Sequence, residues 1–486
     1  MQKTKHLTKR QKQLTNQTKI MSNTKFNFTY LLFLALVSAM GGFLFGYDWV
    51  VIGGAKPFYE LFFDISSNPT LQGWAMSSAL IGCIFGAVIS GVVADKFGRK
   101  LPLILSAALF TISAFGTGYV NEFTPFIIYR LIGGLGIGLA STLSPMYIAE
   151  IAPAKYRGQF VAINQLTLVI GILAAQIANF FIAEAIPESF SPEMILGSWN
   201  GQTGWRWMFW AELIPAVLFF GLMFIVPKSP RFLIKINNNV AAKIVLAKIG
   251  GDAYAEEELS SIKQTLQEGD TSKIKFSDFK SPKVKPILII GIVLAIFQQW
   301  CGINIIFNYA EEIFTAAGYS VGDMLFNIVI TGSVNLIFTL VAMRTVDSWG
   351  RRKLMLLGSI GLGVVYIILG GAYYMEFTGL PVLLLVITAI AIYSMSLAPI
   401  TWVVLSEIFP NKIRGVAMSI ATFSLWIASF ILTFTFPILN DALGASGTFW
   451  VYGFICIAGF LFIKNKLPET KGKSLEEIEL ELTKEK

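Results

Sequence analysis

The chain has 486 residues, of which 55% are hydrophobic and only 14% are charged. This composition excludes a soluble multidomain protein, because too few polar residues remain to cover folded surfaces in water. The net charge of +8 does not indicate nucleic-acid binding, since the basic residues cluster in short connectors and tails. We therefore expect most of the chain to lie in a lipid bilayer.

Residues 1–26 contain seven lysine or arginine residues and no acidic residue. No apolar stretch precedes them, so we expect a disordered basic cytoplasmic tail and not a signal peptide. The only histidine, His6, lies in this tail, and Cys83, Cys301 and Cys456 fall within apolar segments. We therefore expect neither a metal site nor a cofactor.

Stretches of about 20 mainly apolar residues are long enough to span a bilayer. Twelve candidates begin near Asn27, Gln72, Pro102, Thr124, Gln159, Trp205, Pro286, Asp323, Lys353, Pro381, Gly415 and Ser446. They predict an all-α membrane protein of twelve transmembrane helices in two pseudo-symmetric six-helix bundles. The expected bundles are residues 27–227 and 286–465, joined by a cytoplasmic helical linker at 228–285 and followed by a cytoplasmic tail at 466–486.

Positive charge in the connectors predicts the orientation of the spans. The connectors after the second, fourth, eighth and tenth spans carry lysine and arginine, whereas those on the other side carry almost none, Lys56 being the exception. Positively charged loops stay in the cytoplasm. We therefore expect both termini to be cytoplasmic.

Two motifs recur about half a chain apart at the ends of apolar segments. DKFGRK returns as DSWGRRK, and EIAPAKYRG returns as EIFPNKIRG. Internal repeats of this kind indicate a duplicated bundle with a ligand site between the halves. We expect the repeated charges to act as cytoplasmic gating clamps, with ordinary surface pairs of little energy as the alternative. The clamp residues are Asp95, Arg99, Glu150, Arg157, Asp347, Arg351, Glu407 and Arg414.

Ionisable residues inside a bilayer are costly and indicate function. Three such residues are Asp48 in the first span, Arg130 in the fourth and Glu212 in the sixth. Asp48 and Arg130 lie at matching depths, so we expect them to pair and to couple transport to a proton. A static salt bridge is the alternative, and Glu212 is the weaker candidate.

Neutral amides and aromatic rings in the spans predict a site for a polyol. A sugar offers hydroxyl groups around a ring with apolar faces, which amides and tryptophans can bind. Gly302 marks a local helix break that would aim nearby amides inward, and hydrogen bonds between helices are the alternative role. The candidates are Gln165, Gln176, Gln298, Gln299, Asn304, Asn335, Trp402 and Trp426.

Four glycines in the fourth span superficially resemble a dinucleotide-binding loop. Gly133, Gly134, Gly136 and Gly138 lie within an apolar stretch that no strand precedes. We therefore expect these glycines to allow close helix packing.

Several motifs in order resemble those of the sugar porter family in the major facilitator superfamily. They are FGYD, YRLIGGLGIG, PMYIAE, PKSPRFL, QQWCGIN, DSWGRR and PETKG, between about residues 26 and 472. The chain looks most like bacterial D-xylose/proton symporters. The resemblance implies alternating access, with Asp48 carrying the proton and Arg130 as its partner. It also implies sugar contacts from Gln165, Gln298, Gln299, Asn304 and Trp426.

The chain departs from the xylose symporters at Ile172, Asn308, Leu397 and Leu425, where sugar-site residues of that group differ. We therefore expect a proton-coupled importer of a pentose or hexose, monomeric in a bacterial inner membrane, with monosaccharide, proton and lipid as its partners. A passive uniporter of the same fold and a non-transporting sugar sensor are the alternatives. No cluster of nucleophile, base and orienting residue indicates an enzyme.

Overall fold

The computed structural model is entirely helical over the residues that it describes, which are 25–187, 189–269, 281, 284–409 and 413–471. The side chains of residues 267–269 and 346–348 are also outside the description. Most of the expected basic N-terminal tail, with His6, and most of the expected C-terminal tail lie outside the described residues.

The first half of the chain contains six membrane-spanning stretches. They are α2 (Phe28–Phe62), α3 (Pro69–Phe97), α4 (Lys100–Tyr119), α5 (Phe123–Ile151), α6 (Arg157–Ile182), and a composite of η1 (Asn200–Gly204), α8 (Trp205–Trp210) and α9 (Leu213–Ile225). A short helix, α7 (Pro192–Gly197), precedes the composite span. The helix break between α8 and α9 falls at Ala211 and Glu212, inside a span that the sequence predicts as continuous.

The second half also contains six stretches, two of which are interrupted. The helices are α13 (Lys285–Trp300), α14 (Ile303–Asn308), α15 (Ala310–Ala316), α16 (Val321–Trp349), α17 (Arg351–Tyr374), α18 (Leu380–Met395), α19 (Leu397–Ile408) and α20 (Arg414–Lys466). Gly302 adopts a left-handed conformation between α13 and α14, as expected for the local break. Ser396 separates α18 from α19.

Helix α20 contains the last two spans. Its 53 residues correspond to about 80 Å of helix, far more than the ~30 Å hydrocarbon core of a bilayer. Gly444 has a φ of 66°, which folds the chain back within α20. Eleven helical stretches of the described chain are long and apolar enough to span a membrane, with α20 counted once. The predicted fold class, two bundles of six spans, is confirmed.

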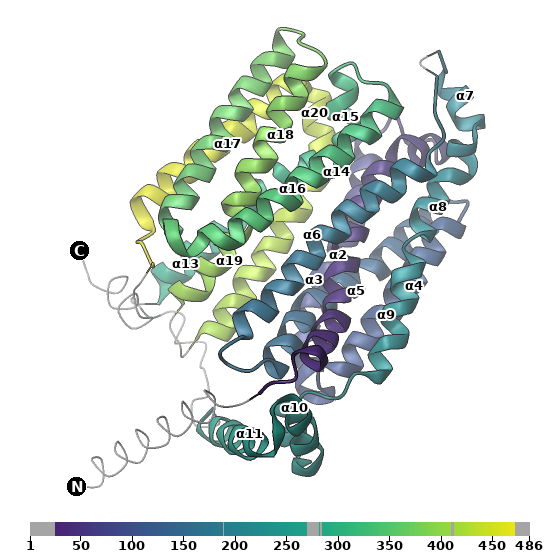
Figure 1. Cartoon of the computed structure of the whole chain (residues 1–486). Helices are drawn as coiled ribbons and strands as arrows, with labels where there is room; N and C mark the ends of the chain where they lie inside the picture. The colour runs from purple at the N-terminus through teal and green to yellow at the C-terminus, as the bar shows by residue number, and fades with distance from the viewer. Residues whose placement is uncertain (1–24, 188, 270–280, 282–283, 410–412, 472–486) are drawn as a thin grey trace.

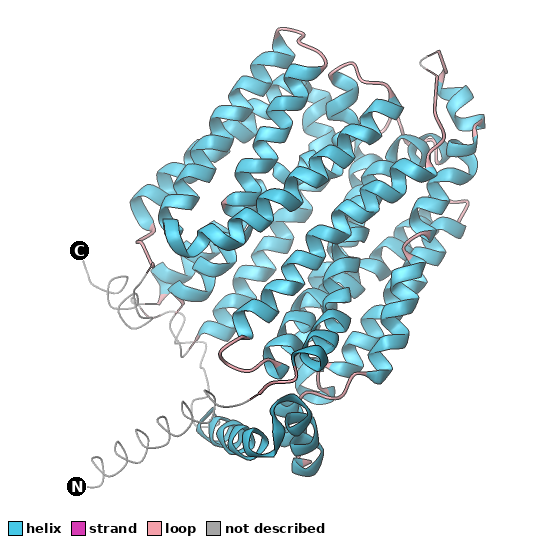
Figure 2. Ribbon diagram, viewed as in Figure 1, coloured by secondary structure: helices cyan, strands magenta, loops and turns pink. Residues whose placement is uncertain are grey.

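The two bundles stand side by side, and the helices α10 (Pro230–Lys235) and α11 (Asn239–Gly269) lie beneath the first bundle (Figures 1 and 2). We call the end of the molecule that carries α10 and α11 the linker face and the opposite end the far face. The bundles touch near the far face, where the rings of Phe180 and Phe326 are 5.9 Å apart. Gly73 of α3 also packs directly against the backbone of Phe434 in α20.

Close glycine contacts join α3 to α5 within the first bundle. A Cβ atom at Gly134 would lie 1.8 Å from the carbonyl oxygen of Ala79, and one at Gly138 would lie 2.4 Å from that of Cys83. No side chain fits in such a space, so the glycines allow the helix backbones to approach. The expectation of close helix packing in the fourth span is met.

Candidate functional site

An ion pair lies inside the first bundle, between the middle of α2 and the first half of α5. Arg130 donates a hydrogen bond from Nη1 to Oδ1 of Asp48, and both side chains are at least 97% buried. The Asp48 carboxylate also packs against Gly133, where only hydrogen occupies the side-chain position. Within the described chain, Asp48 Oδ2 and Arg130 Nε have no hydrogen-bond partner. The pair therefore keeps unused hydrogen-bonding capacity.

Glu212 adds a second carboxylate to this pair. It sits at the break between α8 and α9, is 2% exposed, and interacts electrostatically with both Asp48 and Arg130. Its Oε1 has no hydrogen-bond partner among the described residues. Two buried carboxylates near one guanidinium carry a net negative charge when both are ionised. A bound proton removes that charge, so the three groups have the chemistry of a proton site.

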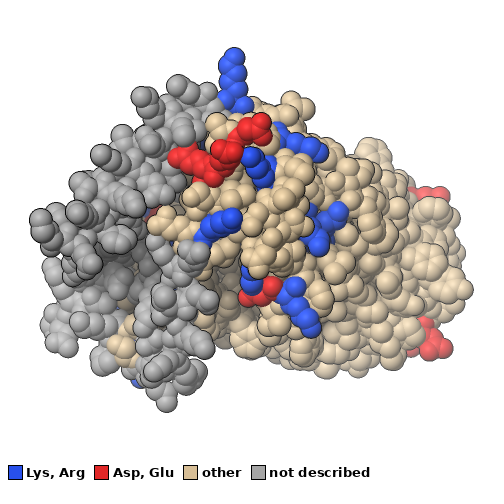
Figure 3. Space-filling model, turned by 90° about the horizontal axis from the view of Figure 1, so that it is seen from below, with Lys and Arg blue, Asp and Glu red and all other residues tan. Residues whose placement is uncertain are grey.

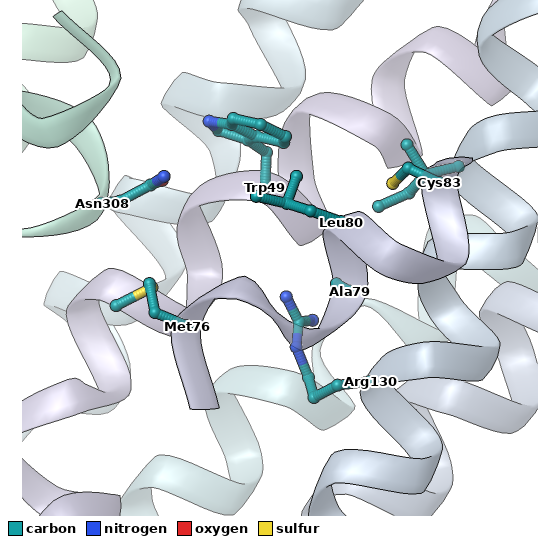
Figure 4. A pocket seen from close by; sticks show the side chains of 8 residues that line it. Trp49, Met76, Ala79, Leu80, Cys83, Arg130 and Asn308 are labelled. Carbon is teal, nitrogen blue, oxygen red and sulfur yellow. The ribbon is translucent and has the colours of Figure 1, made fainter. Parts of the chain in front are cut away.

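Residues of both bundles line a small cavity beside Arg130. Its volume is about 10 Å³, roughly the space that one water molecule needs. Figure 4 shows Asn308, from α14, and Arg130 on opposite sides of the view, with Trp49 above both. The remaining lining side chains are Met76, Ala79, Leu80, Cys83 and Ile137. Asn308 is 4% exposed and, within the described chain, its Oδ1 is unpartnered.

Three amide side chains around Gly302 form a continuous hydrogen-bond chain. Asn304 donates to Gln299 Oε1, and Gln299 donates to Gln298 Oε1. Gln298 in turn donates to the hydroxyl of Tyr393 on α18, at 2.6 Å. The three amides are 6–9% exposed, so they are shielded from bulk water. The helix break places these donors and acceptors on one surface inside the second bundle.

An aromatic contact joins the bundles at this level. The ring of Trp426, on α20, lies 5.8 Å from that of Phe45 and 6.1 Å from that of Trp49, both on α2. Trp426 is 4% exposed, and its indole Nε1 has no hydrogen-bond partner within the described chain. The ring provides an apolar face and a free donor in one place, which suits a sugar.

The other predicted sugar-site residues are more scattered. Gln176 of α6 is buried against Gly332 of α16, and within the described chain both its amide atoms lack partners. Asn335 accepts a 2.7 Å hydrogen bond from Ser394 within the second bundle. Gln165 is half-buried, and Trp402 is 37% exposed. The structure does not bring Trp402 into the amide chain or the aromatic contact.

Ion pairs within each bundle occur at the linker face. Arg99 lies 2.7 Å from Glu150 in the first bundle, and Arg351 lies 3.1 Å from Glu407 in the second. The two pairs join corresponding spans, as the repeated motifs indicate.

The remaining clamp residues have other environments. Asp95 pairs with Lys235 of α10 at 2.9 Å, and Arg414 donates to the carbonyl of Phe409 at 3.2 Å. Arg157 is exposed and has no ion pair within the described chain. The side chain of Asp347 lies outside the described ones.

Sequence reasoning missed residues whose role depends on contacts between distant segments. Tyr393 ends the amide chain, and Phe45 and Trp49 cover Trp426. Glu469 accepts hydrogen bonds from the backbone nitrogen atoms of Arg351 and its neighbour, at 2.9 and 3.2 Å. The acidic residue of the PETKG motif was the available signal for that last contact.

Known proteins resemble the chain over nearly its whole length. A family model described as "Sugar (and other) transporter" matches residues 34–482. The D-xylose-proton symporter of Escherichia coli (strain K12) is 39% identical over 490 residues, covering 94% of this chain and 96% of that protein. The arabinose-proton symporter of Bacillus subtilis (strain 168) is 39% identical over 454 residues, covering 93% of this chain and 94% of that protein.

A solved structure gives the same result for the fold. The inward open conformation of the xylose transporter from E. coli matches with a TM-score of 0.80 and 37% identity, covering 93% of this chain and 99% of that one. The likeness therefore includes both bundles and the segment that joins them.

Proposed function

Because the chain belongs to the sugar transporter family of the major facilitator superfamily, we propose that it imports a monosaccharide together with a proton by alternating access. Proteins of this family are transporters and not enzymes. The observation that carries the proposal is the buried pair of Asp48 and Arg130, with Glu212 beside it. A passive carrier has no need for a titratable group at that depth.

In the proposed cycle, Asp48 carries the proton. Protonation of Asp48 removes its charge and weakens its bond to Arg130, which then interacts more strongly with Glu212. The guanidinium can shift because its Nε is unpartnered within the described chain and a small cavity adjoins it. A shift of Arg130 toward or away from Asn308 alters the contact between the bundles. Proton binding is in this way linked to their relative movement.

The sugar is bound between the bundles by neutral groups. Gln298, Gln299 and Asn304 offer donors and acceptors from one bundle, and Trp426 offers an apolar face for the ring. Gln165, Gln176, Asn335 and Trp402 remain candidate sugar contacts outside the amide chain and the aromatic contact. Each hydroxyl of the sugar replaces a hydrogen bond that the amides otherwise make with one another.

We propose a pentose or a hexose as the substrate. The named relatives are symporters for xylose and arabinose, two pentoses. Ile172, Leu397 and Leu425 place apolar side chains where the resemblance implies sugar-contacting groups, and all three are at least 93% buried. Asn308 replaces a larger aromatic residue with a smaller amide. The pocket therefore differs in shape from that of a xylose symporter.

The linker face is proposed to face the cytoplasm of a bacterial cell, with the protein in the inner membrane as a monomer. Figure 3 shows lysine and arginine side chains over the described part of this face. Positively charged segments resist transfer across the membrane. Both chain ends then lie in the cytoplasm, together with the clamp pairs Arg99–Glu150 and Arg351–Glu407.

Asp48→Asn tests the proposal directly. The variant is expected to lose accumulation of radiolabelled sugar in energised vesicles, because an amide cannot carry the proton. It is expected to keep sugar exchange between loaded vesicles and medium, because the amide chain is intact. An uncoupler should abolish accumulation by the unaltered protein. If Asp48→Asn still concentrates sugar, the coupling role is wrong. Exchange without accumulation by the unaltered protein would identify a uniporter, and binding without exchange a sensor.

A further inference from the structure

A second charged cluster joins the two bundles near the far face. Lys56 of α2 lies 3.0 Å from Glu60 of the same helix, 3.0 Å from Glu311 and 2.7 Å from Glu312, both on α15. Lys56 is 2% exposed and Glu60 is 5% exposed. Gln72 of α3 also donates to Glu60, at 3.0 Å. One lysine is therefore shared by carboxylates from both bundles.

The charges in this cluster do not balance. Three ionised carboxylates around one ammonium leave a net charge of −2 in a largely dry environment, which is unfavourable. Within the described chain, Glu60 Oε1 and Glu312 Oε2 have no hydrogen-bond partner. Other titratable groups that face the cluster are Tyr59 and Tyr309, with Arg130 farther away. None of these removes the excess negative charge, because neutral tyrosines add no positive charge and Arg130 is bound to Asp48.

Opening the far face must break this cluster. Lys56 and Glu60 belong to one helix and stay together, whereas Glu311 and Glu312 move away with the second bundle. Once apart, the two carboxylates are hydrated and no longer share a lysine with Glu60. The crowding of like charges therefore exists only when the far face is closed.

We infer that Lys56, Glu60, Glu311 and Glu312 form a latch that closes the far face and that takes up a proton on closing. The proton comes from water at the far face, since the Glu311 and Glu312 side chains keep about a fifth of their exposure. Acid at the far face then favours the closed latch. The inference rests on the proposed transport cycle, but adds a second proton-linked step outside the Asp48 site.

The electrostatic environment of Glu312 is consistent with this latch. Glu312 lies beyond the spanning stretch that ends at Asn308. Burial raises the pKa of its carboxyl to about 8; Glu311 and Glu60 add to the rise, and Lys56 opposes it. The closed form thus binds a proton more tightly than an open form with a hydrated carboxyl. The proton on Glu312 therefore stabilises the closed form below pH 8. This stabilisation is lost as the pH rises through 8.

Distances between spin labels across the far face test the latch without sugar. Ser67→Cys and Glu376→Cys place labels on exposed loops of the two bundles, and the three native cysteines are buried. Double electron–electron resonance in lipid nanodiscs is expected to show one short distance below pH 8 and a growing longer-distance population above it. The same series with Asp48→Asn added should still shift toward the longer distance as the pH rises through 8, whatever its starting distribution, which excludes titration of Asp48 as the source.

Two variants and a control decide the outcome. Glu312→Gln places a neutral amide where the closed form has a protonated carboxyl group, so the short distance should persist at every pH. Lys56→Met removes the shared cation, so the longer distance should appear already at neutral pH. Lys243→Met, which breaks an exposed pair with Glu256 inside α11, should behave like the unaltered protein.

A wild-type pH response in Glu312→Gln would overturn the inference, as would wild-type distances in Lys56→Met. If Lys56→Met does not fold, the Glu312→Gln result decides alone. Failure of the proposed sugar symport would appear in the vesicle uptake assays. The spin-label distances are measured without sugar, so the two failures can be told apart.

Discussion

Two groups of buried charges in the described chain combine one cation with more than one carboxylate. Arg130 faces Asp48 and Glu212 inside the first bundle, and Lys56 faces three glutamates near the far face. Each group has a net negative charge when all its acids are ionised, and a proton reduces it. One group lies on the proposed coupling path and the other on the contact that must open. Protons can therefore act at two stages of one cycle.

The central amide of the hydrogen-bond chain offers a test of sugar binding. Gln299→Leu removes the acceptor of Asn304 and the donor to Gln298, and leaves both neighbours without that partner. Sugar affinity is expected to fall about tenfold or more, because unsatisfied buried amides cost about 1–3 kcal/mol. Titration calorimetry on purified protein measures the change. Gln202→Leu, at an exposed position of η1, is the control and should bind normally. Unchanged affinity in Gln299→Leu would remove this amide from the sugar site.

The approach of Asp48 to Arg130 could be predicted from the sequence, because their positions along two spans give similar depths. The Lys56 latch could not, although Lys56 was the exception among the connectors on its side and Glu60 follows it by one helical turn. Its other two carboxylates come from a segment about 255 residues later. Only the packing of α15 against α2 brings them together, and no local pattern encodes that contact.

At the scale of helices, two breaks lie beside side chains that are candidates for function. Gly302 interrupts the seventh span beside the amide chain, and the α8–α9 break carries Glu212. Glycine predicts the first break, because a φ of 85° is accessible to it and costly for other residues. Pro215 predicts the second break, because it has no N–H to donate to the carbonyl of Ala211 one turn earlier. Helical stretches are therefore visible in hydropathy, and glycine or proline marks these breaks within them.

The close contact between α3 and α5 predicts that one added methyl group lowers the stability of the protein strongly. Gly134→Ala places a Cβ atom 1.8 Å from the Ala79 carbonyl oxygen, which forces the helices apart. The expected destabilisation is about 1–3 kcal/mol or more, seen as a lower Tm in a thermal-shift assay in detergent. Gly221→Ala is the matched control, because its Cβ meets no atom within 4 Å on α9. That change should leave Tm unchanged or raise it slightly. Equal Tm values for the two variants would contradict the close approach.

At the scale of the whole molecule, the two halves have the same plan but unequal interiors. The repeated motifs place corresponding ion pairs, Arg99–Glu150 and Arg351–Glu407, at the linker face of each half. The proposed proton site lies in the first bundle, and the amide chain lies in the second. A proton bound in one half can therefore influence a sugar bound in the other only through their contact. Trp426 against α2 and the cavity beside Asn308 are the described points where the two sites meet.

The direction of transport depends on which face of this molecule meets the cytoplasm. Two exposed serines mark the faces: Ser67 at the far face and Ser260 on α11 at the linker face. Charged connectors at the linker face should hold it inside the cell. A membrane-impermeant maleimide is therefore expected to label Ser67→Cys in intact cells, and Ser260→Cys only after the membrane is permeabilised. The reverse pattern would invert the orientation, and the Lys56 latch would then close the cytoplasmic end of the path.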